Sequence, residues 1–220
     1  MLTGMKRYLT PSSYVRAINR GLRRLVCRYA GIEEWHATPI RDRPYAVAVV
    51  KHLNELDSAH ERCIAEIGCG LGEILRSVEW SHRDGFDADE GVIRVARVIS
   101  RFRRDQGMRF EVAALPGIVL NGRYDAIVMV NWIHHIDKNT LSSSLRYFSE
   151  VNLKKNGIIV IDTVGDPAYR FNHDINELAV VSGMSYTSLG KFDRSREVFV
   201  LQRNSQSKLE VNLGDRIPAH

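Results

Sequence analysis

The sequence has few of the features that mark secreted or membrane proteins. Its three cysteines, Cys27, Cys63 and Cys69, are an odd number and lack the spacing of a metal site. No apolar run approaches the ~20 residues that span a bilayer. The N-terminus also lacks the apolar segment and small-residue cleavage site of a signal peptide. We therefore expect a cytoplasmic protein with no disulfide framework and no metal centre.

Acidic residues are absent before Glu33, whereas the same stretch carries seven basic ones: Lys6, Arg7, Arg16, Arg20, Arg23, Arg24 and Arg28. Apolar residues recur there at helical spacing, at Tyr14, Ile18, Leu22, Leu25, Val26 and Tyr29, and Gly31 is a suitable stop. This pattern predicts an amphipathic basic helix. Such a helix either caps a domain with a solvated charged face or contacts an anionic membrane surface or nucleic acid.

The most informative stretch is C-I-A-E-I-G-C-G-L-G-E, residues 63–73. A short apolar run, interrupted only by Glu66, is followed by glycines at alternate positions: Gly68, Gly70 and Gly72. This order predicts a strand, a tight turn and a helix, because glycine permits positive φ and lets a ligand lie against the main chain. A dinucleotide fingerprint beginning at Gly68 would need a small residue where this chain has Glu73, so a pyrophosphate-binding turn is disfavoured.

The run fits E/D-x-G-x-G-x-G instead, and the next predicted strand, residues 83–87, closes on G-F-D-A-D. Together these motifs resemble those of the class I S-adenosylmethionine-dependent methyltransferases. The resemblance implies S-adenosyl-L-methionine as the cofactor, with Asp87 accepting both ribose hydroxyls. A carboxylate suits that role because it can accept two hydroxyl protons at once. The implied cofactor-binding residues in these motifs are Glu66, Gly68, Cys69, Gly70, Gly72, Asp87 and Ala88.

The third predicted strand, residues 108–113, leads into Ala114 and Leu115. Members of the resembled family often carry an acid here that accepts from the adenine amino group, and this chain has none. We therefore expect backbone groups and apolar contacts at Ala114 and Leu115 to hold the adenine.

The fourth predicted strand reads Y-D-A-I-V-M-V and ends in N-W-I-H-H-I, residues 131–136. Its nearly continuous apolar sequence is typical of a central parallel strand buried on both faces. The ending resembles that of small-molecule methyltransferases, which implies that Asn131 lies beside the cofactor and that Trp132, His134 and His135 lie near the acceptor. The alternative is structural, with one imidazole turned into the core.

The remaining pattern predicts a helix over residues 138–153, ended by Gly157 in the left-handed conformation, a fifth strand over 158–164 and a helix capped by Asn172. Two final strands joined at residues 193–196 form an antiparallel hairpin. The predicted fold class is α/β, a Rossmann-like, mostly parallel seven-stranded sheet with helices on both faces and extra N-terminal helices. We divide the chain into residues 1–45, a basic helix and possible lid, residues 46–203, a class I methyltransferase domain, and residues 204–220, a flexible tail.

The two prolines in residues 33–45 predict a loop, which in the resembled family commonly folds over the cofactor or acceptor pocket. Its candidate lid and substrate residues are Trp35, His36, Arg41 and Tyr45, and Tyr169 is a further candidate in the connection after the fifth strand. A packing role for Trp35 and Tyr45 is the alternative.

The expected function is methyl transfer from S-adenosylmethionine to an oxygen or nitrogen of a small-molecule acceptor, with His134 and His135 as candidate bases because their ordinary pKa lies near neutrality. Cations on a lid would favour an anionic acceptor, or one linked to carbohydrate or lipid. Two alternatives are RNA methylation, using the basic N-terminal arm and the arginines from Arg97 to Arg104, and a non-catalytic cofactor-binding module. The sequence gives no indication of oligomeric state.

Overall fold

The computed structural model describes residues 24, 25, 27–56 and 61–204. The N-terminal portion contains the 3₁₀ helices η1 (Glu34–Ala37) and η2 (Ile40–Asp42) and the helix α2 (Pro44–Glu55). The following elements are β1 (Cys63–Ile67), α3 (Glu73–Ser77), β2 (His82–Asp87), α4 (Glu90–Arg103), β3 (Met108–Val112) and β4 (Tyr124–Met129). The remainder are η3 (Ile133–His135), α5 (Lys138–Tyr147), the π-helical turn η4 (Phe148–Asn152), β5 (Leu153–Val164), α6 (Ile175–Ser182), β6 (Met184–Phe192) and β7 (Arg196–Arg203).

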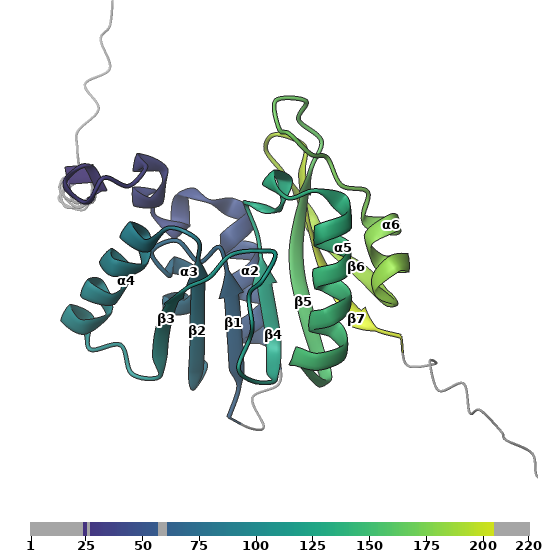
Figure 1. Cartoon of the computed structure of the whole chain (residues 1–220), viewed down its shortest axis with the longest axis horizontal. Coiled ribbons are helices and arrows are strands. Elements are labelled where there is room, and N and C mark those ends of the chain that lie inside the picture. The colour runs from purple at the N-terminus through teal and green to yellow at the C-terminus, as the bar shows by residue number, and fades with distance from the viewer. Residues whose placement is uncertain (1–23, 26, 57–60, 205–220) are drawn as a thin grey trace, which may run out of the picture.

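Seven strands form one sheet in the order β3-β2-β1-β4-β5-β7-β6 (Figure 1). The five strands β1 to β5 are parallel, and β7 is antiparallel to both of its neighbours, β5 and β6. This arrangement confirms the predicted fold class and the C-terminal hairpin. The strand order reverses between β1 and β4, so a crevice for ligands lies at the carboxyl ends of these two strands.

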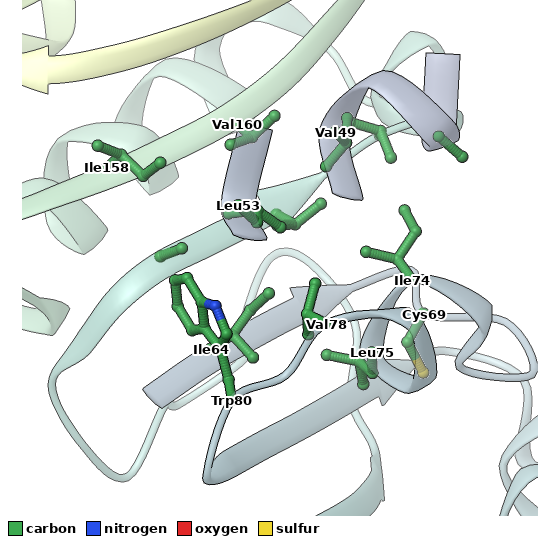
Figure 2. Close-up of a cluster of buried hydrophobic side chains, with 14 of the residues drawn as sticks. Val49, Leu53, Ile64, Cys69, Ile74, Leu75, Val78, Trp80, Ile158 and Val160 are labelled. Carbon is green, nitrogen blue, oxygen red and sulfur yellow. The ribbon is translucent and has the colours of Figure 1, made fainter. Parts of the chain in front are cut away.

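Two apolar clusters cover opposite faces of the sheet, because successive side chains of a strand point to opposite sides. Ile64 of β1 joins the cluster beneath α2, α3 and α4, whereas its neighbour Ala65 joins the cluster beneath α5 and α6. Figure 2 shows part of the first cluster, where Leu53 and Val49 of α2 approach Ile74 and Leu75 of α3 and the strands below them. The helices therefore cover both faces, as the sequence predicts.

The N-terminal basic helix, of which residues 24, 25 and 27–30 are described, packs differently from its predicted apolar stripe. Of that stripe, Leu25 and Tyr29 are described, and both are exposed, Tyr29 almost completely. Cys27 is buried instead, in a cluster that includes Ile32 and Val92. The predicted face is therefore wrong at residues 25 and 29, because α4 meets the helix on the side that carries Cys27. The other stripe positions, at residues 14, 18, 22 and 26, lie outside the described residues. Gly31 does follow the helix with φ +70°.

Three predicted boundaries are wrong. The fifth strand begins at Leu153 rather than residue 158, and Gly157 lies inside it instead of stopping a helix. A Cβ there would lie 2.9 Å from the Tyr124 carbonyl oxygen, so Gly157 is needed for close strand approach and not for a left-handed turn. Helix α6 is capped by Asp174 rather than Asn172, since the Asp174 carboxylate accepts from the Asn176 backbone N–H at 2.7 Å. Separately, Phe102 continues the apolar spacing of α4, yet its side chain is 86% exposed.

Candidate functional site

The glycine turn follows β1 at the point where the strand order reverses. Gly68, Gly70 and Gly72 have φ of +73°, +53° and +77°, the left-handed region that glycine enters without steric cost. The backbone N–H groups of Gly68 and Cys69 both donate to the Phe86 carbonyl, at 2.7 and 2.9 Å. The turn is therefore held against the end of β2.

Asp87 completes this connection at the last position of β2. One of its carboxylate oxygens accepts from the Gly70 N–H at 2.9 Å, and the other accepts from the Asp89 N–H at 3.1 Å. A carboxylate has about four lone-pair sites, so each oxygen retains capacity for another donor. Asp87 can therefore hold the glycine turn and still accept hydroxyl groups of a ligand.

Glu66 is the most strongly perturbed acid of the site. Its side chain is buried, and its Oε2 atom has no hydrogen-bond partner among the described residues. Burial is the largest influence and raises the pKa of Glu66 to about 8, against the opposing effect of Arg43. Glu66 is consequently protonated at neutral pH unless a cationic ligand group approaches it.

Glu66 should make folding stability pH-dependent. Because its pKa rises from 4.5 to about 8 on folding, the folded state holds an extra proton between these values, and stability falls as pH rises through that window. The slope approaches about 1.4 kcal/mol per pH unit. We expect Glu66→Gln, which stays neutral, to lose this dependence in urea unfolding measured from about pH 5 to pH 9. Stability curves that run parallel for wild type and variant would contradict this assignment.

Two rings lie directly on the glycine turn and nearly close it. A Cβ added at Gly68 would lie 2.2 Å from Cδ1 of Trp132, and one at Gly70 would lie 3.0 Å from Nδ1 of His36. The Trp132 indole N–H also donates to the Ile67 carbonyl. The remaining cavity has a volume of about 30 Å³, whereas sites for cofactor-sized ligands usually have about 300–1,000 Å³. A ligand on this turn must therefore displace at least one ring.

The segment carrying His36 reaches the turn from η1. Trp35 stacks on His36 with ring centroids 3.6 Å apart, and its indole N–H donates to the Glu33 carboxylate. Burial lowers the pKa of His36, although nearby Asp87 acts in the opposite direction. Arg41 is exposed, lies 3.9 Å from Asp42 and does not line the cavity. Residues 35 and 36 thus cover the turn, while Arg41 faces outward.

A buried polar network at the end of β4 is absent from the sequence-based prediction. Asn131 adopts φ +71°, and its backbone N–H donates to Asp162 at 2.7 Å. Its side-chain oxygen accepts from Arg196 at 2.8 Å, and Arg196 also forms an ion pair with Asp162. The Arg196 guanidinium lies over the Tyr45 ring, 4.6 Å from its centroid. The network therefore fixes Asn131 and Tyr45, both of which line the cavity.

The paired histidines have different surroundings. His134 is buried, with its ring 4.3 Å from His135 and 4.0 Å from Tyr169, centroid to centroid. Burial, followed by the neighbouring His135, lowers the pKa of His134 to about 4, so this imidazole is neutral at physiological pH. His135 is exposed. The cavity on the glycine turn is lined by neither histidine and not by Tyr169.

A scan against known protein families finds no matching model, and no curated protein sequence matches. Solved structures do match. Magnesium protoporphyrin IX methyltransferase (ChlM) from Synechocystis PCC 6803 with bound SAM has 15% identity and a TM-score of 0.63, over 91% of this chain and 100% of that one. A putative O-methyltransferase from Nostoc punctiforme PCC 73102 has 15% identity and a TM-score of 0.59, over 73% and 56% of the two chains. The methyltransferase domain of bacterial CtHen1 has 18% identity and a TM-score of 0.53, over 72% and 96%.

The chain has the class I methyltransferase fold. Within this fold, nine predicted site residues line one cavity: Trp35, His36, Tyr45, Glu66, Gly68, Cys69, Gly70, Asn131 and Trp132. Gly72 and Asp87 adjoin it through the turn, as described above. Ala88 and Ala114 are exposed, and Leu115 packs partly against the core, so the cavity does not extend to them.

Sequence reasoning missed Asp162 and Arg196, whereas Arg43 belongs to the loop of residues 33–45 that was predicted to cover the pocket. Arg43 lines the cavity, where its charge favours ionisation of Glu66. Asp162 could have been found from the sequence, since an acid at the end of the apolar run I-I-V-I-D requires a buried partner. In the described part of the chain, no cluster of three or more His, Cys, Asp and Glu residues could hold a metal ion, and every helix is too short or too polar to cross a membrane.

Proposed function

We propose that this protein transfers a methyl group from S-adenosylmethionine to an oxygen or nitrogen of a small molecule. The observation that carries the proposal is the link between the glycine turn and Asp87, formed by the 2.9 Å hydrogen bond from the Gly70 N–H. It joins a turn with glycine at three alternate positions to a carboxylate that can still accept hydrogen bonds from hydroxyl groups. The fold supports this function, because similar structures include a methyltransferase with bound SAM and one with bound SAH.

The residues fit S-adenosylmethionine on two further points. The rings of Trp132 and His36 lie against Gly68 and Gly70, which shows that flat groups pack on this backbone. The unpartnered Oε2 of Glu66 is an acceptor in the cavity wall, and a cationic group beside it would return its pKa towards the ordinary range. When bound, the cofactor supplies an electrophilic methyl group on a sulfonium centre.

The chain's own residues would contribute positioning and exclusion of water. Arg196 and Asp162 hold Asn131 and Tyr45 at one wall of the cavity, and Trp35 and His36 cover its mouth. Holding two reactants in the right geometry accounts for a large share of many enzymatic rate enhancements. A hydroxyl acceptor also needs a base, and His134, with a pKa of about 4, is poorly matched to neutral pH. The exposed His135 is therefore the better candidate of the pair.

The acceptor we propose is a small anionic molecule, including one linked to a carbohydrate or lipid. Arg43 lines the cavity and Arg41 lies exposed on the covering segment, so cations are present at the cavity and beside its mouth. Positive charge along a cleft raises the local concentration of anions and their association rate. We propose the covering segment as a lid for this acceptor, with the preceding helix as a cap anchored by Cys27.

The test is calorimetric titration of the full chain with S-adenosylmethionine, followed by an acceptor screen. Binding should weaken about 100-fold in Asp87→Ala, because two hydroxyl bonds to a charged group contribute about 1.5 kcal/mol each. Asp193→Ala, which removes an exposed acid in the β6–β7 turn, is the matched control and should bind normally. Failure of the wild type to bind would refute the proposal. Binding without turnover of any acceptor would favour a cofactor-binding module.

A further inference from the structure

A second concave site lies between the second half of α4 and β3, next to the glycine turn, because its lining residue Phe110 packs against Gly72. This groove has a volume of about 440 Å³, and its lining includes Arg97, Arg101, Arg104, Met108 and Phe110. Helix α4 begins beside Asp87 and runs for 14 residues, about 21 Å at 1.5 Å per residue, before it ends beside the groove. The groove shares no lining residue with the cavity on the glycine turn, and β3 forms the edge of the sheet beside it (Figure 1).

The groove has an excess of positive charge. Its acid, Asp105, already forms ion pairs with Arg76 at 2.8 Å and Arg103 at 3.8 Å. Within residues 24–56 and 61–204 as described, Arg97, Arg101 and Arg104 have no carboxylate within 4.0 Å. The helix C-terminus contributes only about half a negative charge, so the described part of the chain does not balance these three guanidinium groups.

Arg104 occupies a backbone position that favours glycine. It caps α4 with φ +57° and ψ +43°, the left-handed conformation in which a Cβ is unfavourable. Its side chain is exposed and has no hydrogen bond or ion pair within the described structure. An arginine here therefore weakens the helix end without a packing gain, which points to a role outside folding.

Arg97 in the groove and Phe102 on the neighbouring face of α4 suit a nucleic-acid strand, which offers both phosphates and bases. Arg97 donates twice to the Phe110 carbonyl, at 2.9 and 2.6 Å, so its guanidinium is fixed in place with further N–H groups available. Phe102 does not line the groove; it lies on the neighbouring face of the same helical turn as Arg101 and is 86% exposed. Fixed cations beside an exposed aromatic ring are the combination that binds single strands, by phosphate contact and base stacking.

We propose that this groove binds single-stranded nucleic acid, with Arg97, Arg101 and Arg104 contacting phosphates and Phe102 stacking on a base. Arg94 extends the same side of α4 towards Asp89, since spacings of three and four residues keep side chains on one helix face. The bound nucleic acid would thus run along α4, from the groove towards the carboxyl ends of the β-strands, where the glycine turn lies. This site does not depend on the proposed methyl transfer.

The test is fluorescence anisotropy of a labelled oligouridylate and an oligodeoxythymidylate, each about 12 nucleotides long, across a salt series. Three phosphate contacts predict that log K falls with log salt with a slope of about −2, at about 0.7 per contact. Arg104→Gly should leave the melting temperature unchanged or raise it, weaken binding several-fold and reduce the slope by about 0.7. Phe102→Ala should weaken binding about tenfold and leave the slope unchanged.

Arg123→Gln is the matched control, because it removes one exposed positive charge in the loop before β4, away from the groove. If Arg123→Gln and Arg104→Gly weaken binding equally, the attraction comes from net charge and the groove is excluded. Absence of binding at about 50 mM salt would also overturn the proposal. If inorganic triphosphate displaces the oligonucleotide completely and Phe102→Ala has no effect, the groove binds small phosphates and the nucleic-acid assignment is wrong.

Discussion

Replacing Asp162 by alanine is expected to lower the free energy of unfolding by about 3–5 kcal/mol, which removing one partner of a buried ion pair typically costs. The Asp162 side chain is 1% exposed and that of Arg196 is 6% exposed. The variant leaves the Arg196 guanidinium buried without its counter-charge. It also removes the acceptor for the Asn131 backbone N–H, bonded at 2.7 Å. Urea unfolding followed by circular dichroism measures the change.

Two further variants test whether the loss of stability in Asp162→Ala comes from the buried, unpaired charge of Arg196. Glu177→Gln breaks the Lys138–Glu177 pair, in which both side chains are about half exposed, and should change stability by less than about 1 kcal/mol. Asp162→Ala combined with Arg196→Met should be more stable than Asp162→Ala alone, because no uncompensated charge remains. A loss as small as that of Glu177→Gln would mean that water reaches Arg196 and that the network does not hold Asn131 in place.

The sequence predicts the glycine turn well because its determinants are contiguous. Gly68, Gly70 and Gly72 each require positive φ, and the strand before them and the helix after them are local patterns. Asp87 follows from the end of the neighbouring strand, where parallel strands place their carboxyl ends at one edge. Local chemistry and sheet topology agree at this site, so the motif alone is sufficient to predict the glycine turn and the position of Asp87.

The Asn131–Asp162–Arg196 network could not be predicted in the same way. Asn131 is 65 residues from Arg196, and their contact depends on β7 pairing antiparallel with β5 in one register, in which Asp162 lies opposite Val198. The sequence indicates that a buried acid needs a partner, but several arginines in polar stretches were equally suitable as the counter-charge of Asp162. Register across distant strands, rather than local propensity, selects Arg196.

Local sequence patterns are misleading at the end of α4 and before β5. They carry no information about where the sheet ends or how the strands pair. Phe102 continues the apolar spacing of α4, but β3 is the edge strand, so none of the described elements covers the last turn of α4 on that side. L-K-K-N-G resembles a helix stop, yet Lys154 forms an ion pair with Asp125 at 2.7 Å and already belongs to β5. In both places tertiary contact overrides the local signal.

Replacing Gly68 by alanine is expected to abolish measurable S-adenosylmethionine binding while the protein stays folded. The new Cβ would occupy the backbone surface on which we propose the cofactor lies, and it would meet the Trp132 ring at 2.2 Å. The left-handed backbone at φ +73° adds strain of about 1–2 kcal/mol. Calorimetric titration measures the affinity, and a thermal melt of the same sample shows that the fold persists.

Gly183→Ala is the control that separates the effect of backbone strain from the effect of the new Cβ at Gly68. Gly183 has nearly the same φ, +67°, at the end of α6, but a Cβ there meets no atom within 4 Å. Both variants should therefore lose a similar amount of stability to strain, about 1–2 kcal/mol, and only Gly68→Ala should lose the cofactor. Equal cofactor affinity in the two variants would place the ligand away from the glycine turn, since one extra methyl group in the cradle would then have no effect on binding.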